Sequence, residues 1–162
     1  MAAQQLYQLY AKAIYNSILR LGFRPEEAQD LLQESFIKGF NQISELKEAA
    51  AFGAWLKRIA INLGLQEIRK QKRTAPWLEL EEIAEDLSEQ EENWPDIGFH
   101  ELQTALGTLP AGCKLIFELY FLEEYSHQEI ASEMQISVST SKSQLHYAKR
   151  LLREKLNQHY EA

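Results

Sequence analysis

The sequence has one cysteine, no long apolar run and a wide stretch without positive charge, and each of these shortages excludes a class of site or structure. Cys113 alone cannot form an internal disulfide or a multi-cysteine zinc site, and its neighbours Leu115 and Ile116 indicate a buried structural thiol. No apolar segment reaches the length of a membrane span, and residues 1–13 lack the basic start and apolar block of a signal peptide. We therefore expect a cytoplasmic protein. Its 162 residues, 45% of them hydrophobic, can form a sizeable core in one domain or two small ones.

Charge is distributed unevenly along the chain, whose formal net charge is −7. Residues 1–73 carry +4, residues 74–113 contain ten acids and no Lys or Arg, and residues 114–162 carry −1. A stretch without cations that is also interrupted by proline and glycine is typical of a linker. We therefore expect one domain at 1–73, an acidic linker at 74–101 and a second domain at 102–162.

Helical periodicity dominates the first domain. Apolar residues at helical steps predict a first helix that ends before Gly22, and Pro25 suits the first turn of a second helix. Two further apolar stripes are expected to be buried: Ala28, Leu32, Phe36, Phe40 and Ile43 in the second helix, and Phe52, Trp55, Leu56, Ile59, Ala60 and Leu63 in the third. No segment has the two-residue period of a strand, so the prediction is an all-α fold of two small helical domains.

Residues 125–156 have the pattern of a helix-turn-helix. Ser126 and Glu129 form a capping box that predicts a helix from about His127, and residues 135–137 suffice only for a tight turn, with a serine at its end to cap the next helix. The next helix has an apolar face of Val138, Leu145, Ala148, Leu152 and Leu156. Its other face is expected to contact a DNA major groove: Ser139, Thr140, Ser143, Gln144, His146, Tyr147, Lys149, Arg150 and Arg153. Spacing alone leaves open a solvated helical hairpin.

Two polar faces in the first domain are also candidates for binding. Asp30, Gln33 and Glu34 lie at helical spacings of three and four, so they share a face that can present carboxylates to a basic partner. Along the third helix, cations suited to phosphates alternate with amides suited to base edges: Lys57, Arg58, Asn62, Gln66 and Arg69. Without other observations, ordinary solvated helix surfaces explain both faces.

Three segments in this order resemble a sigma factor of RNA polymerase, of the extracytoplasmic-function (ECF) type that has only the second and fourth sigma domains. AQDLLQESFIKGF (28–40) resembles the family's segment that docks on the coiled coil of the largest polymerase subunit. FGAWLKRIAINLGLQEIRKQKR (52–73) resembles the promoter-melting helix. Residues 105–156 resemble the fourth domain, from its leucine-proline start through its recognition helix.

The resemblance assigns roles to the polar faces. It implies that the face of Asp30, Gln33 and Glu34 binds core RNA polymerase, and that the polar side of the third helix lies along the non-template strand of the minus-ten element. It further implies that residues 44–51 hold an unstacked base from that element, and that the helix-turn-helix contacts the minus-thirty-five element. The expected protein is a non-catalytic initiation factor without cofactor or metal. Its partners are polymerase and promoter DNA, with an anti-sigma factor as a further partner that the resemblance allows.

The recognition helix departs from the family pattern at three positions. Ser141 stands where an apolar residue is usual, and Gln144 and Tyr147 stand where arginines are common. Fewer cations therefore reach the DNA. We expect a minus-thirty-five contact that is weak or that reads an unusual sequence.

Two other function classes fit parts of the sequence. A helix-turn-helix regulator that acts without polymerase needs only residues 125–156, and it leaves the docking-type and melting-type segments unexplained; polymerase-independent operator binding would favour it. An enzyme would need more than Cys113, His127 and His146, because the chain has no nucleophile motif, paired carboxylates, metal-ligand spacing or glycine-rich phosphate loop.

Overall fold

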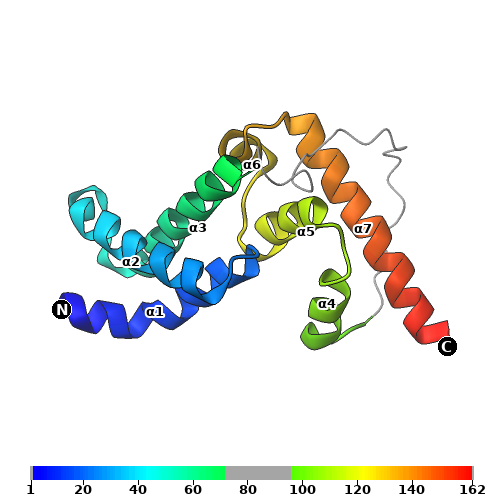
Figure 1. The fold of residues 1–162 in the computed structure, drawn as a ribbon, viewed down its shortest axis with the longest axis horizontal. Coiled ribbons are helices and arrows are strands. Elements are labelled where there is room, and N and C mark those ends of the chain that lie inside the picture. Colours follow the sequence, from blue (N-terminus) through cyan, green and yellow to red (C-terminus); the bar gives the residue numbers. More distant parts are fainter. Residues whose placement is uncertain (1, 72–95, 162) are drawn as a thin grey trace. The chain divides into compact units, whose positions relative to one another are not determined.

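The structure is a computed structural model that describes residues 2–71 and 96–161, with side chains as far as residue 158 (Figure 1). The chain forms two compact units, Met1–Lys70 and Gln71–Ala162. The described residues form helices and connecting turns without any strand, which confirms the all-α prediction. Most of the expected linker lies outside the described residues. No described helix has both the length and the hydropathy that a membrane crossing requires.

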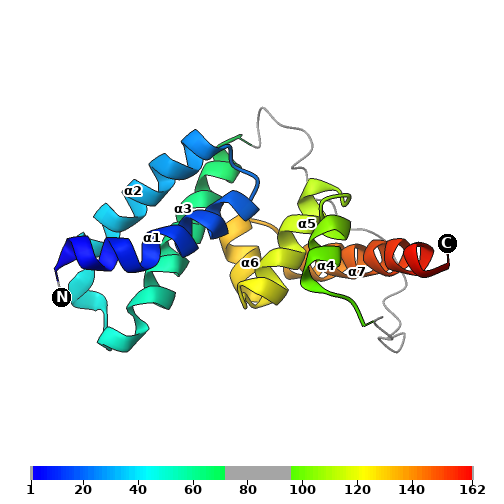
Figure 2. The ribbon, with the colours of Figure 1, turned by 90° about the horizontal axis from the view of Figure 1, so that it is seen from below.

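The first two helices of unit 1 begin and end at local sequence signals. α1 (Ala3–Arg20) is followed by Gly22, whose φ of +104° is a left-handed conformation that glycine adopts without strain. α2 (Pro25–Asn41) starts with proline in its first turn, and its first turn carries two glutamates beside the positive end of the helix dipole. Both boundaries confirm the predictions. α1 and α2 lie side by side and run in opposite directions (Figures 1 and 2).

The third helix of unit 1 follows two single turns of 3-10 helix. η1 (Ile43–Glu45) and η2 (Ala49–Ala51) connect α2 to α3 (Phe52–Gln71). Apolar side chains from all three α-helices form the core of the unit: Ile14, Ile18, Ala28, Leu31, Leu32, Phe36, Phe52, Leu56, Ala60, Ile61, Leu63, Leu65 and Ile68. The predicted stripes of α2 and α3 therefore face the core.

Four members of these predicted stripes are not fully buried. Phe40, Trp55 and Ile59 are half-buried. The expectation that Ile43 is buried is wrong, because α2 ends at Asn41 and Ile43 starts η1 with 43% of its surface exposed.

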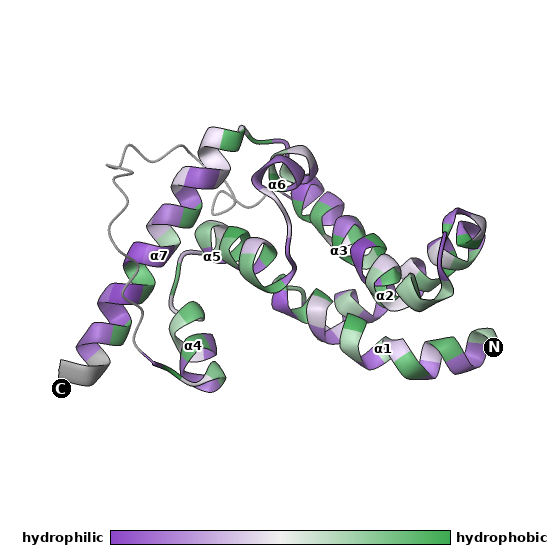
Figure 3. Cartoon of the chain, turned by 180° about the vertical axis from the view of Figure 1, so that it is seen from behind, coloured by the Kyte–Doolittle hydropathy of each residue, from purple (hydrophilic) through white to green (hydrophobic). Residues whose placement is uncertain are grey.

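Unit 2 is built around one long helix. α4 (Phe99–Leu106), α5 (Ala111–Phe117) and α6 (His127–Met134) each pack on α7 (Val138–Glu161), and a π-helical turn, η4 (Glu118–Leu122), follows α5. Figure 3 shows hydrophilic and hydrophobic residues alternating along α7, as a helix covered on one side requires. The core contains Leu106, Leu109, Leu115, Ile116, Leu119, Ile130, Met134, Leu145, Ala148, Leu152 and Leu156.

Cys113 belongs to this core, as its apolar neighbours predict. The side chain is 1% exposed, and its Sγ donates to the Pro110 carbonyl at 3.4 Å. Burial raises the pKa of the thiol to about 11, so it stays protonated and unreactive at neutral pH. The geometry is that of a structural residue.

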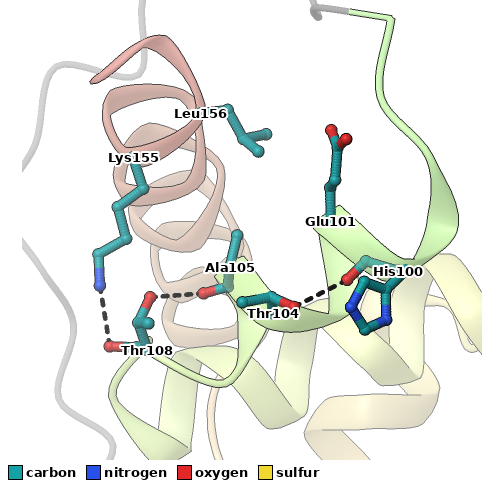
Figure 4. Close-up of a pocket in the computed structure, with 7 residues that line it drawn as sticks. All are labelled: His100, Glu101, Thr104, Ala105, Thr108, Lys155 and Leu156. Carbon is teal, nitrogen blue, oxygen red and sulfur yellow. Dashed lines mark hydrogen bonds between the residues drawn. The ribbon is translucent and has the colours of Figure 1, made fainter. Parts of the chain in front are cut away.

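A groove of about 330 Å³ separates α4 from the C-terminal end of α7 (Figure 4). Ala105 and Leu156 give it apolar lining, and His100 and Glu101 line it from α4. Lys155 Nζ donates at 3.0 Å to the carbonyl of Thr108 in the turn after α4, which ties the two elements together.

Candidate polymerase and promoter interfaces

The helix-turn-helix begins at the predicted residues. Ser126 caps α6: its Oγ accepts from the Glu129 amide at 3.1 Å, and its own amide donates to the Glu129 carboxylate at 3.1 Å. Gln135 then turns the chain with a φ of +55°, and the Thr140 amide donates to Ser137 Oγ at 2.9 Å. The capping box, the tight turn and the cap of the second helix are all confirmed.

The burial pattern along α7 differs from the expected two faces. Leu145, Ala148, Leu152 and Leu156 are buried as predicted, whereas Val138 is 36% exposed. The expectation that Thr140, Ser143 and Gln144 lie on the exposed face is wrong, because their exposed fractions are only 8%, 2% and 7%. α7 packs against α4, α5 and α6, and its buried surface is wider than one apolar stripe.

The accessible face of α7 retains the other expected groove residues. Exposed or half-exposed side chains are Ser139, His146, Tyr147, Lys149, Arg150 and Arg153. Lys142, which the apolar pattern did not single out, is exposed on the same face, three residues after Ser139 and four before His146. This spacing was sufficient to predict that Lys142 belongs to the exposed face. The Arg150 guanidinium lies over the Tyr147 ring at 5.2 Å, so the aromatic side chain supports a cation on this face.

The polar side of α3 is accessible along its length. The five predicted residues are all half-exposed: Lys57, Arg58, Asn62, Gln66 and Arg69. The last four step by four, four and three, which places them on one side of the helix. This surface pairs cations with amides, as contacts to a nucleic-acid backbone and to base edges require.

A pocket of about 410 Å³ opens between the 3-10 turns and the start of α3. It is lined by Glu45, Leu46, Lys47, Glu48, Ala51 and Trp55. Trp55 was expected in the apolar stripe; instead it is half-buried, with its ring tilted 46° against Phe52 at 6.0 Å between centroids. Phe52 is held in turn by Tyr10 at 5.4 Å. The Trp55 ring thus packs on a core residue and also lines a pocket whose other lining residues include the apolar Leu46 and Ala51.

The predicted carboxylate face of α2 is exposed and includes an apolar residue that the sequence analysis missed. Asp30, Gln33 and Glu34 are all exposed. Ile37 follows Glu34 by three residues on the same face and is 63% exposed. Ile37 does not fall on the buried apolar stripe of α2, so its exposure was predictable from the sequence. An exposed apolar residue beside polar ones is consistent with a protein-binding surface, whose buried part is apolar and whose rim is polar.

Among the residues that the structure describes, no group of His, Cys, Asp or Glu could hold a metal ion.

Comparison with known proteins decides the family. Residues 6–74 match the family model "Sigma-70 region 2", and residues 99–152 match "Sigma-70, region 4". The ECF RNA polymerase sigma-E factor of Haemophilus influenzae is 31% identical over 145 residues, which are 78% of this chain and 73% of that protein. The chain belongs to the ECF sigma factors.

Other relatives agree with this assignment. SigW of Bacillus subtilis is 28% identical over 96% of this sigma factor and 89% of the relative. SigE of Mycolicibacterium smegmatis is 29% identical over 96% of the chain, which spans 62% of that longer protein. The sigma factor RpoE of Bartonella quintana, solved in complex with the anti-sigma factor NepR, has the same fold, with a TM-score of 0.54 at 21% identity over 95% of this chain and 96% of that one.

The two family models coincide with the candidate surfaces. The region 2 match contains most of α1 and all of α2 and α3, including the carboxylate face, the polar side of α3 and the pocket. The region 4 match begins with α4 and contains α6 and α7 as far as residue 152. α4 also begins inside the segment expected to be linker, because Phe99 starts the helix.

Proposed function

We propose that this sigma factor binds core bacterial RNA polymerase and directs it to promoters by contacts at the minus-ten and minus-thirty-five elements, with strand opening at the former. The observation that supports this most directly is the order of a region 2 unit and a region 4 helix-turn-helix in one chain. Polymerase performs the chemistry, so the chain itself needs neither catalytic residues nor a cofactor. It acts in the bacterial cytoplasm, where polymerase and DNA are found.

The carboxylate face of α2 is the proposed polymerase-docking surface. Asp30 and Glu34 supply negative charge for a basic partner, which favours fast and specific association. Ile37 supplies the apolar centre that loses its water on binding, as at other protein interfaces. Gln33 lies beside these residues and can hydrogen-bond at the rim.

The polar side of α3 and the adjoining pocket form the proposed minus-ten site. Lys57, Arg58 and Arg69 hold the backbone of the non-template strand, while Asn62 and Gln66 reach base edges. Unstacking a base costs a few kcal/mol, and base–aromatic stacking returns about 1–3 kcal/mol. A pocket of about 410 Å³ with Trp55 in its wall has the size and the aromatic surface to receive such a base.

The accessible face of α7 is the proposed minus-thirty-five reader. The residues proposed to meet the groove are Ser139, Lys142, His146, Tyr147, Lys149 and Arg150; Thr140, Ser143 and Gln144 are buried and are not included. Three of these six residues are cations, which favours phosphate contacts over an extended set of base contacts. We also propose an anti-sigma factor as a regulatory partner, a class that the RpoE structure contains.

Transcription with purified components tests this function. Core polymerase is incubated with the chain and with a fragmented genomic library, and the 5′ ends of the RNA are mapped. The expected result is a set of discrete start sites that appear only when the chain is present, each preceded by shared minus-ten and minus-thirty-five sequences. Tight, sequence-specific DNA binding without polymerase, together with no new start sites, would instead support a polymerase-independent regulator.

A further inference from the structure

Ser141 and His127 meet inside the helix-turn-helix. Ser141, in the first turn of α7, has 0% exposed surface, and its Oγ lies 2.8 Å from Nδ1 of His127, the first residue of α6. The buried residues of α6 and several of those of α7 are apolar: Ile130, Ala131, Met134, Leu145 and Ala148. A buried hydroxyl is costly unless it is hydrogen-bonded, so this contact imposes a geometry that apolar packing alone does not require.

The Ser141–His127 hydrogen bond is the first of several side-chain contacts that start at α7 and lead back to it. The His127 ring stacks on Tyr120 of η4 with 4.7 Å between centroids and 25° between planes. Tyr120 meets Phe121 edge-on at 5.0 Å, and Lys149 Nζ lies over the Phe121 ring at 5.4 Å. Two elements, α6 and η4, are thereby joined to the recognition helix at Ser141 and again two turns later at Lys149.

The hydrogen bond is directional, whereas the packing around it is not. Burial lowers the pKa of His127, and the nearby Lys142 and Lys149 lower it further, so the imidazole is neutral at cellular pH and has one donor and one acceptor nitrogen. Either nitrogen role pairs with a hydroxyl at 2.8 Å only within a narrow range of angles. The hydrophobic burial of the neighbouring apolar side chains, by contrast, has no preferred direction.

We propose that His127 and Ser141 are positioning residues that set the angle of the recognition helix and thereby the upstream promoter preference. This inference rests on the proposed function. Ser139 and Lys142 lie on the exposed side of the same turn as Ser141, so a rotation of α7 about that turn displaces both relative to the groove. Base-edge hydrogen bonds depend on such placement, whereas phosphate contacts by flexible cations adapt to it.

Four variants of the full chain, assembled with core polymerase, separate positioning from folding. Ser141→Ala and His127→Phe each remove the hydrogen bond, and His127→Phe keeps an aromatic ring for Tyr120. The combined variant replaces both polar partners, which is close to neutral for stability when the shapes match. His127→Asn places an amide near the position of Nδ1 and is the conservative variant expected to rescue the contact.

The measurement is the ratio of transcription from the parent's own promoter to transcription from the same promoter with a scrambled upstream element. We expect this ratio to fall about fivefold or more in Ser141→Ala and in the combined variant, which is the loss that one poorly placed base contact produces. His127→Asn should stay near the parent. The melting temperature of the combined variant should lie within about 4 °C of the parent, which shows that the fold is retained.

The possible outcomes distinguish a failure of this inference from a failure of the proposed function. If the parent gives no promoter-dependent transcript, the proposed function is contradicted, and the inference with it. Suppose that the parent gives promoter-dependent transcription, and that Ser141→Ala and the combined variant have the same upstream ratio as the parent. The positioning role is then overturned, while the proposed function stands. The positioning role is also overturned if the upstream ratio falls in proportion to the melting temperature across all four variants and His127→Asn does not restore it.

Discussion

Gly39 of α2 lies so close to Leu56 of α3 that a Cβ atom at position 39 would stand 2.6 Å from the Leu56 Cδ1 atom. Leu56 has 0% exposed surface, and the Trp55 ring lies near the same spot, 3.6 Å from that Cβ position. The side chain of Leu56 therefore has little room to move aside. A glycine permits this close approach of α2 to α3.

Gly39→Ala is expected to lower the free energy of unfolding by about 1 kcal/mol. Overpacking a dense core costs roughly 1–3 kcal/mol, and alanine returns about 1 kcal/mol through its higher helix propensity. Urea unfolding measures the difference. Gly107→Ala is the control: with a φ of −61° and no contact under 3.4 Å, it should stabilise by about 0.4–1 kcal/mol. Effects of the same sign at both positions would contradict the packing argument.

Reversing charge on the docking surface should weaken assembly with polymerase. Asp30→Lys with Glu34→Lys is expected to cost at least about 2 kcal/mol of binding free energy, because the new cations face a basic partner. Binding to core polymerase without DNA measures this. Glu45→Lys with Glu48→Lys makes the same change in net charge at exposed positions of the same unit and should leave the affinity near the parent's. Equal affinities for both double variants would remove the docking assignment from this face.

Asn62 and Gln66 are expected to act in strand opening. Alanine at either position should reduce open-complex formation on duplex promoters more than on a pre-melted template, where the cost of unstacking is already met. Arg69→Ala is the comparison, because a lost phosphate contact should weaken binding to both templates alike. Permanganate footprinting of unpaired thymines reports the open fraction. If the amide variants also affect both templates alike, Asn62 and Gln66 bind only the backbone.

Local signals predicted the helix boundaries of this protein well. Gly22, Pro25 and the pair Ser126 and Glu129 mark helix ends through groups adjacent in sequence, so no knowledge of packing is needed. Ile43 shows the limit of this reasoning. No capping residue signals the end of α2 at Asn41. The apolar period alone therefore predicted, wrongly, that the helix and its buried face extend to Ile43.

The burial of polar residues could not be read from the apolar period. Thr140 and Gln144 precede the buried Ala148 by eight and four residues, on one row of the helix, but they were assigned to the exposed face because they are polar. Ile37 and Lys142 were predictable from their spacing, because each repeats the exposed face of its helix. The pocket beside Trp55 was not, since it depends on how two 3-10 turns fold against α3.

The stability of unit 2 should depend on pH through His127. Its folded-state pKa is below the ordinary value of 6.5, because burial and then Lys142 and Lys149 disfavour the charged ring. The unfolded chain therefore binds this proton at higher pH than the folded chain does. The stabilisation is complete above about pH 6.5 and is lost as the pH falls below that value.

Urea unfolding at about pH 7.5 and about pH 5.5 tests this coupling. The parent should lose more stability between the two conditions than His127→Phe, which has no proton to bind at this site. His100→Gln, at an exposed position on α4, should retain the parent's loss. A loss in His127→Phe as large as the parent's would show that other groups produce the pH dependence.

Tyr147 and Gln144 should respond differently to the same substitution, although both stand where the family commonly has arginine. Tyr147 is half-exposed on the groove face, whereas Gln144 is 7% exposed. Tyr147→Arg adds a cation near DNA, so it should raise the affinity of the full chain for upstream DNA and steepen the log–log salt dependence by about 0.9. Gln144→Arg should instead lower the free energy of unfolding, because its charge must be buried.

Salt titrations of DNA binding and urea unfolding of the two variants decide between these placements. A gain in affinity for Tyr147→Arg with a changed base preference and little change in slope would mean base readout, since an arginine bidentate to guanine discriminates by about 1–3 kcal/mol. No change in affinity, slope or preference would show that position 147 does not face DNA. If Gln144→Arg keeps full stability and steepens the slope equally, its side chain reaches the groove, and the recognition face of α7 is wider than its burial pattern indicates.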